Sequence, residues 1–319
     1  MKAIAWTGYG STDVLQLVEM PRPEPGDQEV LIRVMASDVT AGDARLRGLN
    51  VPPGFALPTR LMFGLLRPRK RVPGMDFAGV VEAVGRSVSA FQPGDALFGT
   101  AGTHFGAHAQ YLCLPQQAVM YRIPDGVGFQ EAVASLFGGM TALHFLEARA
   151  RLSQGQSILI NGASGGVGSA AVQIAKHLQA EVTGVCSTAN LELVTSLGAD
   201  RVIDYSLGSV FDDASDYDFI MDLAGTILPQ IAYAHLKPKG RFIAVNTGLL
   251  TEIRALVDSR LIAGVAEERT DYLERLAELI ADATLKPVID RVYPLEQVAE
   301  AHRYVDLGHK KGSVVIQID

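Results

Sequence analysis

Residues 157–176 constrain the fold of this chain more than any other stretch. They begin as an apolar run of β-formers, turn through small residues at 162–168, and continue with apolar residues at helical spacing. A strand, a tight turn and a helix in this order form the first half of a βαβ unit. Small residues in such a turn let backbone N–H groups and the positive end of the helix approach a pyrophosphate.

The turn has the spacing of a known phosphate-binding fingerprint. The pattern G-x-G-x-x-G is present with its first glycine changed to alanine, as Ala163-x-Gly165-x-x-Gly168. Gly165 stands where a side chain would collide with a phosphate. A glycine corner in some other α/β protein is the alternative. The residues expected to contact the phosphates are Ser164, Gly165, Gly166 and Val167.

Strands and helices alternate after this turn. The second strand ends about twenty residues after the turn, where the ribose of the adenine half of a dinucleotide belongs. This alternation predicts a parallel, doubly wound, Rossmann-type sheet. The expected strands are 181–185, 201–204, 217–222 and 241–245, and the expected helices are 190–197 and 227–235.

The amino-terminal region has a different pattern. Short strand-like runs are separated by proline and glycine clusters, such as residues 21–26 and 92–95. This spacing predicts a mainly antiparallel, partly barrel-like domain. The runs are 2–6, 15–19, 29–35, 79–84 and 109–114.

Length, charge and cysteine content exclude several classes of protein. A chain of 319 residues with 48% hydrophobic residues is long enough for two domains. Its formal net charge of −7 argues against a nucleic-acid partner. Cys113 and Cys186 are too few for a disulfide framework or a cysteine zinc site. The first residues lack a signal-peptide pattern and no apolar run has membrane-spanning length, so we expect a cytoplasmic protein.

Several motifs occur in a linked order: residues 73–81 with Gly85, and residues 93–95, 139–142, 164–168 and 312–316. Together they resemble the medium-chain dehydrogenase/reductase superfamily and, within it, the zinc-free, zeta-crystallin-like quinone oxidoreductase branch. The resemblance covers nearly the whole chain. It implies a GroES-like, partly open β-barrel catalytic domain at 1–123, a Rossmann domain at 124–286, and a return to the catalytic domain at 287–319.

The resemblance implies that the metal of zinc-dependent members is missing. Their three ligand positions match Thr40, Met75 and Gly139, none of which is a competent zinc ligand. The region 99–111 also lacks the four cysteines of the structural zinc lobe. We therefore expect no bound metal.

Three histidines invite a different interpretation. His104 and His108 are four residues apart, but glycines interrupt the segment, so a loop pair beside the substrate mouth is favoured over a metal site. His144 lies at helical spacing with leucines, which favours a buried, hydrogen-bonded histidine.

The residues after the second strand point to the cofactor. No Asp or Glu follows Val185, where an acid would bind the ribose hydroxyls of NAD and repel a 2′-phosphate. We expect NADPH, with NADH as a weaker alternative. An ordinary helix N-cap by Thr188 or Asn190 is the competing explanation. The residues expected to bind the adenosine end are Ser187, Thr188, Asn190 and Tyr205, and the family resemblance adds Thr141, Ala224 and Asn246.

The expected activity is NADPH-dependent reduction of quinones or α,β-unsaturated carbonyl compounds. Conjugation in such substrates delocalises the charge that hydride transfer delivers, so a metal is less needed. Thr40 is the candidate donor to the developing oxyanion, and Asp43 either orients that loop or has a structural turn role. Two alternatives stay open: an NAD(P)-dependent alcohol dehydrogenase or ketone reductase of the same fold, and a non-catalytic NADPH-binding protein.

Two further segments suggest partners. Residues 60–71 are apolar and then basic, and they resemble the variable loop over the substrate cleft in this superfamily. A solvated charge cluster beside a lid is favoured there over a peripheral membrane contact. A helix-like run at 251–257 and a strand at 260–265 would leave a sheet edge exposed, so we expect a homodimer paired across that edge.

Overall fold

The computed structural model describes residues 1–211 and 216–319 of the chain. These residues form two compact units. Unit 1 contains Met1–Val51, Ala56–Phe137 and Glu268–Asp319, and unit 2 contains Pro52–Phe55 and Gly138–Glu267.

The domain bounds predicted from the sequence divide the chain at other positions, after residues 123 and 286. Helix α3 (Phe129–Leu143) runs through the first unit boundary, and helix α8 (Thr270–Ala281) packs on strand β7 (Met120–Arg122) of unit 1. The domain bounds after residues 123 and 286 therefore remain a prediction.

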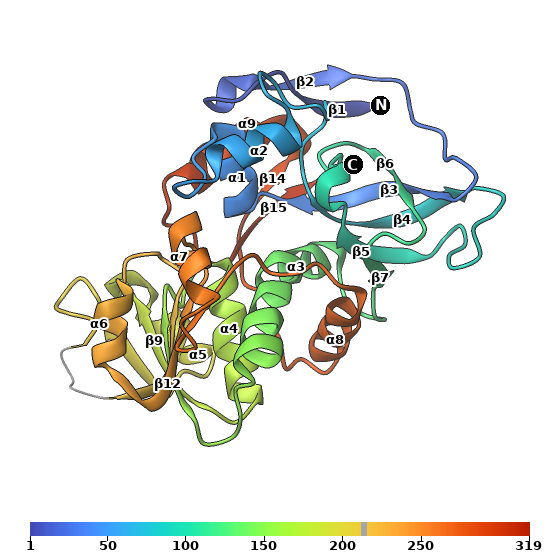
Figure 1. Ribbon diagram of the computed structural model, residues 1–319. Helices are drawn as coiled ribbons and strands as arrows, with labels where there is room; N and C mark the ends of the chain where they lie inside the picture. Colours follow the sequence, from blue (N-terminus) through green and yellow to red (C-terminus); the bar gives the residue numbers. More distant parts are fainter. Residues whose placement is uncertain (212–215) are drawn as a thin grey trace. The chain divides into compact units, whose positions relative to one another are not determined.

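Unit 1 is organised around a seven-stranded sheet that is antiparallel except at one edge (Figure 1). The longest strand, β3, pairs antiparallel with β4, β6 and β15, while β14 pairs parallel with β15. This confirms the predicted GroES-like architecture. The strands are β3 (Glu29–Asp38), β4 (Asp76–Val84), β5 (Ala96–Thr100), β6 (Tyr111–Pro115), β7 (Met120–Arg122), β14 (Ile289–Pro294) and β15 (Ser313–Gln317).

The core of unit 1 lies where the alternate apolar residues of these strands face inward. Ile32, Phe77 and Leu97 are fully buried in it, since period-two patterning places them on one face of the sheet. A two-stranded sheet of β1 (Lys2–Trp6) and β2 (Leu15–Glu19) completes the unit. Its helices are α1 (Ala41–Gly48), α2 (Ala56–Phe63), α8 and α9 (Val298–Asp306), with 3-10 turns at Thr12–Val14, Gly102–His104 and Leu295–Gln297.

Unit 2 is built on a six-stranded sheet in which every neighbouring pair is parallel. The strand order is β10-β9-β8-β11-β12-β13, so the order reverses between β8 and β11. This confirms the predicted Rossmann-type sheet. The strands are β8 (Ser157–Asn161), β9 (Glu181–Cys186), β10 (Arg201–Asp204), β11 (Tyr217–Asp222), β12 (Leu236–Ala244) and β13 (Leu261–Ala263).

Helices connect these parallel strands and pack on them (Figure 1). Helix α4 packs on β8 and β9, α5 on β10, and α6 on β12, as crossover connections require. The helices are α4 (Gly166–His177), α5 (Leu191–Ser196), α6 (Pro229–Ala234) and α7 (Leu249–Ala255), with a π-helical segment at His144–Ala150 and a 3-10 turn at Thr188–Asn190. In the part of the chain that the structure describes, no helix is long and apolar enough to span a membrane.

Candidate functional site

The turn between β8 and α4 has two glycines that the fold itself requires. Gly162 has a φ of +89°, a backbone conformation that L side chains rarely adopt. A Cβ on Gly168 would lie 2.1 Å from the carbonyl oxygen of Gly162. The absence of side chains at these positions lets the chain reverse and lets α4 pack closely against the end of β8.

Gly165 differs from these two glycines. Among the described residues other than its two chain neighbours, a Cβ built there would meet one atom within 4 Å, the carbonyl oxygen of Gly162 at 3.6 Å, which is ordinary contact. Gly165 is also the N-cap of α4, and no side chain caps this helix. The fold therefore tolerates a side chain at Gly165, and the N–H groups of the first turn of α4 are available to an external anion.

Helix α3 approaches the same turn closely. A Cβ on Gly138 would lie 2.2 Å from the carbonyl oxygen of Gly166. Thr141 lies about one turn later on α3 and is buried. Gly166 and Val167 form the first turn of α4 and are partly exposed.

The reversal of strand order places a polar pair at the carboxyl ends of β8 and β11. Asn161 and Asp222 are register partners, and Asn161 Nδ2 donates to Asp222 Oδ1 at 2.8 Å. Both side chains are buried. In open parallel sheets, ligands bind in the crevice at such a switch point. Sequence reasoning missed this pair, although a polar residue that ends an apolar strand was visible in both strands.

Asp222 also shapes the loop that follows β11. Its carboxylate accepts hydrogen bonds from the backbone N–H groups of Ala224, Gly225 and Ile227, at 3.1, 3.0 and 2.8 Å. Ala224 is exposed in this loop. A Cβ on Gly225 would lie 3.2 Å from the Nδ2 atom of Asn246, which follows β12. The structure thus brings Ala224 and Asn246 to the same edge of the sheet as the phosphate turn.

Asn190 joins the phosphate turn to the end of β9. Its Nδ2 donates to Ser164 Oγ at 3.1 Å and to Ser187 Oγ at 3.3 Å. Asn190 Oδ1 is buried and has no hydrogen-bond partner in the described part of the chain. Neither Asn190 nor Ser187 caps its helix with a side-chain hydrogen bond. The side chain of Asn190 is therefore a bridge between two segments of the candidate site.

Thr188 contacts an acid that sequence reasoning missed. Its Oγ1 donates to Asp204 Oδ2 at 2.5 Å, and Ser206 binds the other carboxylate oxygen. These hydrogen bonds, first from Ser206 and then from Thr188, lower the pKa of Asp204. Asp204 ends β10, and it lies here because it is the register partner of Cys186 on β9. Tyr205 follows it and is half exposed.

In unit 1, Thr40 and Asp43 form a capping box at the start of α1. Thr40 N donates to Asp43 Oδ2 at 2.9 Å, Thr40 Oγ1 donates to the same oxygen at 2.5 Å, and Asp43 N donates to Thr40 Oγ1 at 3.0 Å. Both side chains are buried. The hydroxyl proton of Thr40 is therefore committed to Asp43 whenever that carboxyl is ionised.

Asp43 is one of three buried carboxyls in this region. Burial raises the pKa of Asp43 to about 6, although hydrogen bonds from Thr40 act in the opposite direction. Burial, together with the negative charge of Asp43, also raises the pKa of Asp38 and of Asp76 well above the ordinary range. One oxygen of Asp38 and one of Asp76 have no hydrogen-bond partner in the described residues. The cluster therefore holds protons in a pH range where exposed aspartates have none.

The three positions that the family resemblance matched to zinc ligands do not form a set of metal ligands. Thr40 and Met75 lie together in unit 1, both within van der Waals reach of a Cβ built on Gly42, while Gly139 belongs to unit 2. Over residues 1–211 and 216–319, no group of three or more His, Cys, Asp or Glu side chains is arranged to hold a metal ion.

The histidine predictions had different outcomes. His104 is exposed, but His108 is fully buried and its Nδ1 lies 3.0 Å from Ser37 Oγ, so the prediction of a loop pair beside a substrate mouth was wrong. The chain after Gly106 turns the His108 ring into the core, where it packs edge-to-face with His302. His144 is buried and accepts a hydrogen bond from Glu267 N at 3.5 Å, as predicted.

The sequence matches two known protein families and is similar to several characterised proteins. Residues 26–125 match the "Alcohol dehydrogenase GroES-like domain" family and residues 197–316 match the "Zinc-binding dehydrogenase" family. The chain is 32% identical to the chloroplastic quinone oxidoreductase QR1 of Triphysaria versicolor, covering 99% of this chain and 98% of that protein. It is 33% identical to an NADPH-dependent alkenal/one oxidoreductase of Arabidopsis thaliana, covering 99% of this chain and 79% of that protein.

A solved structure shows the same fold over the full length. The quinone oxidoreductase from Coxiella burnetii superposes with a TM-score of 0.88 at 27% identity, covering 100% of this chain and 99% of that one. The relatives support an oxidoreductase that uses a nicotinamide cofactor. The chain belongs to the medium-chain dehydrogenase/reductase superfamily and, within it, to the zeta-crystallin-like quinone oxidoreductase branch.

Proposed function

We propose that this protein reduces quinones or α,β-unsaturated carbonyl compounds with hydride from NADPH and without a catalytic metal. The observation that carries the proposal is the uncapped start of α4 beside Gly165. Its free N–H groups and the positive end of the helix fit the pyrophosphate of a dinucleotide. The bound cofactor supplies the hydride, and the chain supplies binding, orientation and proton handling.

Ser164, Gly165, Gly166 and Val167 hold the pyrophosphate in this proposal, because they form the turn and the first residues of α4. Asn190 keeps the turn in place through its bond to Ser164 Oγ. Thr141 on α3, Ala224 after β11 and Asn246 after β12 are proposed to complete the nicotinamide side of the crevice.

Two features support NADPH over NADH. No acid follows β9 directly, and the hydroxyls of Ser187 and Tyr205 remain available to a 2′-phosphate. The Arabidopsis relative is named for its use of NADPH. Asp204 acts against this preference, because its lowered pKa keeps it charged and it occupies the hydroxyl of Thr188. NADPH is therefore the preferred cofactor in this proposal, and NADH is a usable one.

Thr40 is the proposed donor to the oxygen on which charge develops during hydride transfer. When Asp43 is ionised, Thr40 donates to it at 2.5 Å and has no proton for a substrate. When Asp43 is protonated, the carboxyl donates to Thr40 Oγ1 and releases the hydroxyl proton of Thr40. The pair thus links substrate polarisation to the protonation of a carboxyl whose pKa is about 6.

The absence of competent ligands at Thr40, Met75 and Gly139 supports a reaction without zinc. Although the family matched by residues 197–316 is described as zinc-binding, the side chains at these three positions offer a hydroxyl, a thioether and no donor at all. A conjugated acceptor fits this chemistry, because it delocalises the delivered charge without a Lewis acid.

The test is NADPH oxidation by the purified protein against a matched panel. We expect turnover with quinones and with enones, and much slower turnover with the saturated ketones of the same carbon skeleton. Faster reaction with saturated ketones, or oxidation of alcohols with NADP+, would favour the alcohol dehydrogenase alternative. Tight NADPH binding without turnover of any acceptor would favour a non-catalytic binding protein.

A further inference from the structure

The segment of residues 56–71 combines exposed apolar and basic side chains. It contains α2 and the loop that follows, and none of the residues of α2 is buried. Leu61, Met62 and Leu66 are 56%, 61% and 89% exposed, and Leu57 and Leu65 are more than half exposed. Residues 56–71 contain five Arg or Lys and no Asp or Glu, in a chain with a net charge of −7. Charge and apolar surface are therefore concentrated together at one place.

This segment is held in a fixed conformation. Phe63 packs edge-to-face on Phe105 at 5.5 Å, and Tyr9 OH donates to the carbonyl oxygen of Gly64 at 2.9 Å. Arg60 donates to the carbonyl oxygen of Leu65 at 2.6 Å. These contacts hold the backbone on both sides of the turn at Gly64. The leucines are therefore exposed on an ordered segment.

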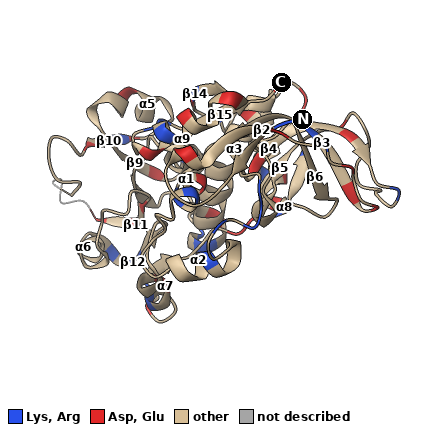
Figure 2. Ribbon diagram, turned by 90° about the horizontal axis from the view of Figure 1, so that it is seen from above, with Lys and Arg blue, Asp and Glu red and all other residues tan. Residues whose placement is uncertain are grey.

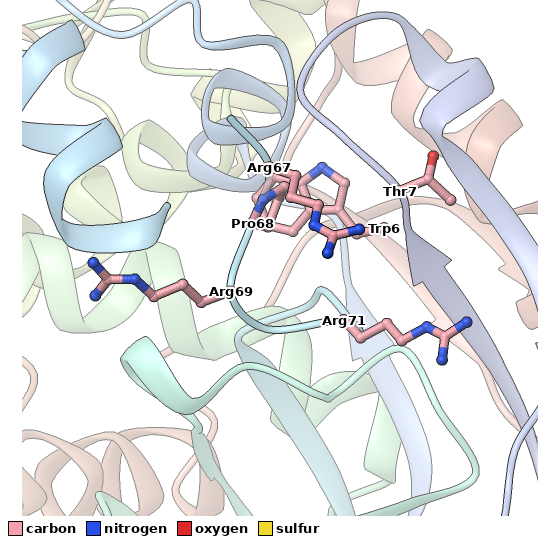
Figure 3. A pocket seen from close by; sticks show the side chains of 6 residues that line it. All are labelled: Trp6, Thr7, Arg67, Pro68, Arg69 and Arg71. Carbon is pink, nitrogen blue, oxygen red and sulfur yellow. The ribbon is translucent and has the colours of Figure 1, made fainter. Parts of the chain in front are cut away.

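The basic side chains surround an open hollow of about 720 Å³ lined by Trp6, Thr7, Arg67, Pro68, Arg69 and Arg71. Figure 3 shows that Arg69 and Arg71 point in opposite directions, so the guanidinium groups spread apart. Arg69 donates to the carbonyl oxygens of Leu61 and Met62. Across the described residues, no acidic partner is seen for Arg67, Lys70 or Arg71.

We propose that the segment of residues 56–71 docks the protein on a membrane surface that contains anionic phospholipid. Separate headgroup phosphates would meet the spread basic groups, and the leucines and Met62 would enter the boundary between headgroups and acyl chains. Figure 2 shows the basic residues beside α2. This proposal departs from the solvated charge cluster favoured in the sequence analysis, because the apolar side chains are exposed together with the basic ones.

The observations favour this partner over two others. A single small anion needs donors that converge, whereas these side chains diverge. A single-stranded nucleic acid would need aromatic side chains for stacking, but the exposed large hydrophobic side chains of this segment are Leu57, Leu61, Met62, Leu65 and Leu66. A bilayer leaflet accepts spread cations and exposed aliphatic groups together.

The test is flotation of the purified full chain with vesicles of phosphatidylcholine, with or without phosphatidylglycerol. We expect binding only to the anionic vesicles, and release at high salt because screening weakens the attraction. The triple variant Arg67→Ala, Lys70→Ala, Arg71→Ala is expected to bind about a hundredfold more weakly, since each basic residue near an anionic surface contributes about fivefold. Leu66→Ser, at the most exposed leucine, is expected to weaken binding about tenfold without disturbing the fold.

A matched control removes the same charge elsewhere. Lys239, Lys286 and Arg303 are exposed outside the segment, and their triple alanine variant is expected to bind as the parent does. Equal weakening by both triple variants would overturn the proposal, because it would show a response to net charge alone. Failure of the parent to float with anionic vesicles, or self-association without lipid that the Leu66 variant abolishes, would also overturn it.

Discussion

Each unit contains a helix that follows a strand and a short turn: α1 in unit 1 and α4 in unit 2. The first turns of these two helices are capped differently. In unit 1, the capping box of Thr40 and Asp43 satisfies the first turn of α1 from within the chain. In unit 2, α4 begins at Gly165 without any side-chain cap. The first turn of α1 is capped by its own side chains and buries a titratable carboxyl, whereas the first turn of α4 leaves donors for an external anion. In the proposed function, helix starts of the same topology thus serve proton handling in one unit and cofactor binding in the other.

The largest effect is expected at Gly165 in the phosphate turn, where a side chain should block the cofactor without disturbing the packing of the protein. Gly165→Val should weaken NADPH binding by at least about a hundredfold, or ~2.7 kcal/mol, because the side chain fills the space of the phosphate. Its melting temperature should stay near that of the parent, since a Cβ there meets only one atom at 3.6 Å. Calorimetric titration and thermal unfolding measure the two effects.

Gly168→Ala is the matched comparison. Its Cβ would lie 2.1 Å from the carbonyl oxygen of Gly162, so this variant should lose stability first. If Gly165→Val binds NADPH as the parent does, the proposed position of the pyrophosphate is wrong.

The second prediction concerns the capped helix start. Asp43 keeps its proton to a pKa of about 6 in the folded chain against an ordinary 3.8, so the folded state is favoured at low pH by this group. Stability should fall by roughly 3 kcal/mol as pH rises from about 4 to 6, and Asp43→Asn should remove that component. Urea unfolding of parent and variant across this pH range measures the difference.

The same substitution tests the proposed proton link. Turnover of the parent should fall as pH rises above about 6, because ionised Asp43 accepts the hydrogen bond of the Thr40 hydroxyl, which is then not available to a substrate. Asp43→Asn cannot ionise and should flatten this part of the profile. If turnover of the variant falls with rising pH as that of the parent does, ionisation of Asp43 does not control the Thr40 hydroxyl during the reaction.

A smaller effect is expected at the adenosine end of unit 2. Ser187→Asp should shift the ratio of NADPH to NADH affinity at least about tenfold toward NADH, through repulsion of the 2′-phosphate. Asp204→Asn should shift it the other way, because it removes a negative charge and leaves a single acceptor oxygen for the hydroxyls of Thr188 and Ser206. Titration of both cofactors with each variant gives the ratios; no change in either would show that these residues do not read the phosphate.

The smallest effect is expected from a substitution at the edge of the unit 2 sheet, and it concerns the oligomeric state. Strand β13 is the last strand in the order β10-β9-β8-β11-β12-β13, and Val265 beyond it is exposed. An unpaired edge of this kind favours pairing across a two-fold axis. We expect a homodimer by light scattering at micromolar concentration, and Val265→Lys should shift it toward monomer. A parent that is monomeric at this concentration would contradict the expectation.

The sequence predicted what depends on local pattern. The strands Arg201–Asp204 and Tyr217–Asp222 begin and end as expected, because their apolar runs are bounded by polar residues. The parallel sheet followed from the alternation of strands and helices. These features need only neighbouring residues to be recognised.

What the sequence did not show depends on register and on side-chain direction. Asp204 contacts Thr188 only because β10 pairs with β9, and the Asn161–Asp222 bond exists only because β8 and β11 are neighbours. His108 was misjudged because a loop position gives no sign of which way its ring turns.

The central claim is hydride transfer from NADPH without zinc, and chelation tests it most directly. Protein dialysed against a strong chelator is analysed for metal and then assayed for NADPH oxidation with a simple quinone. We predict less than stoichiometric zinc before dialysis and unchanged turnover after it. Stoichiometric zinc whose removal abolishes turnover, and whose return restores it, would contradict the account.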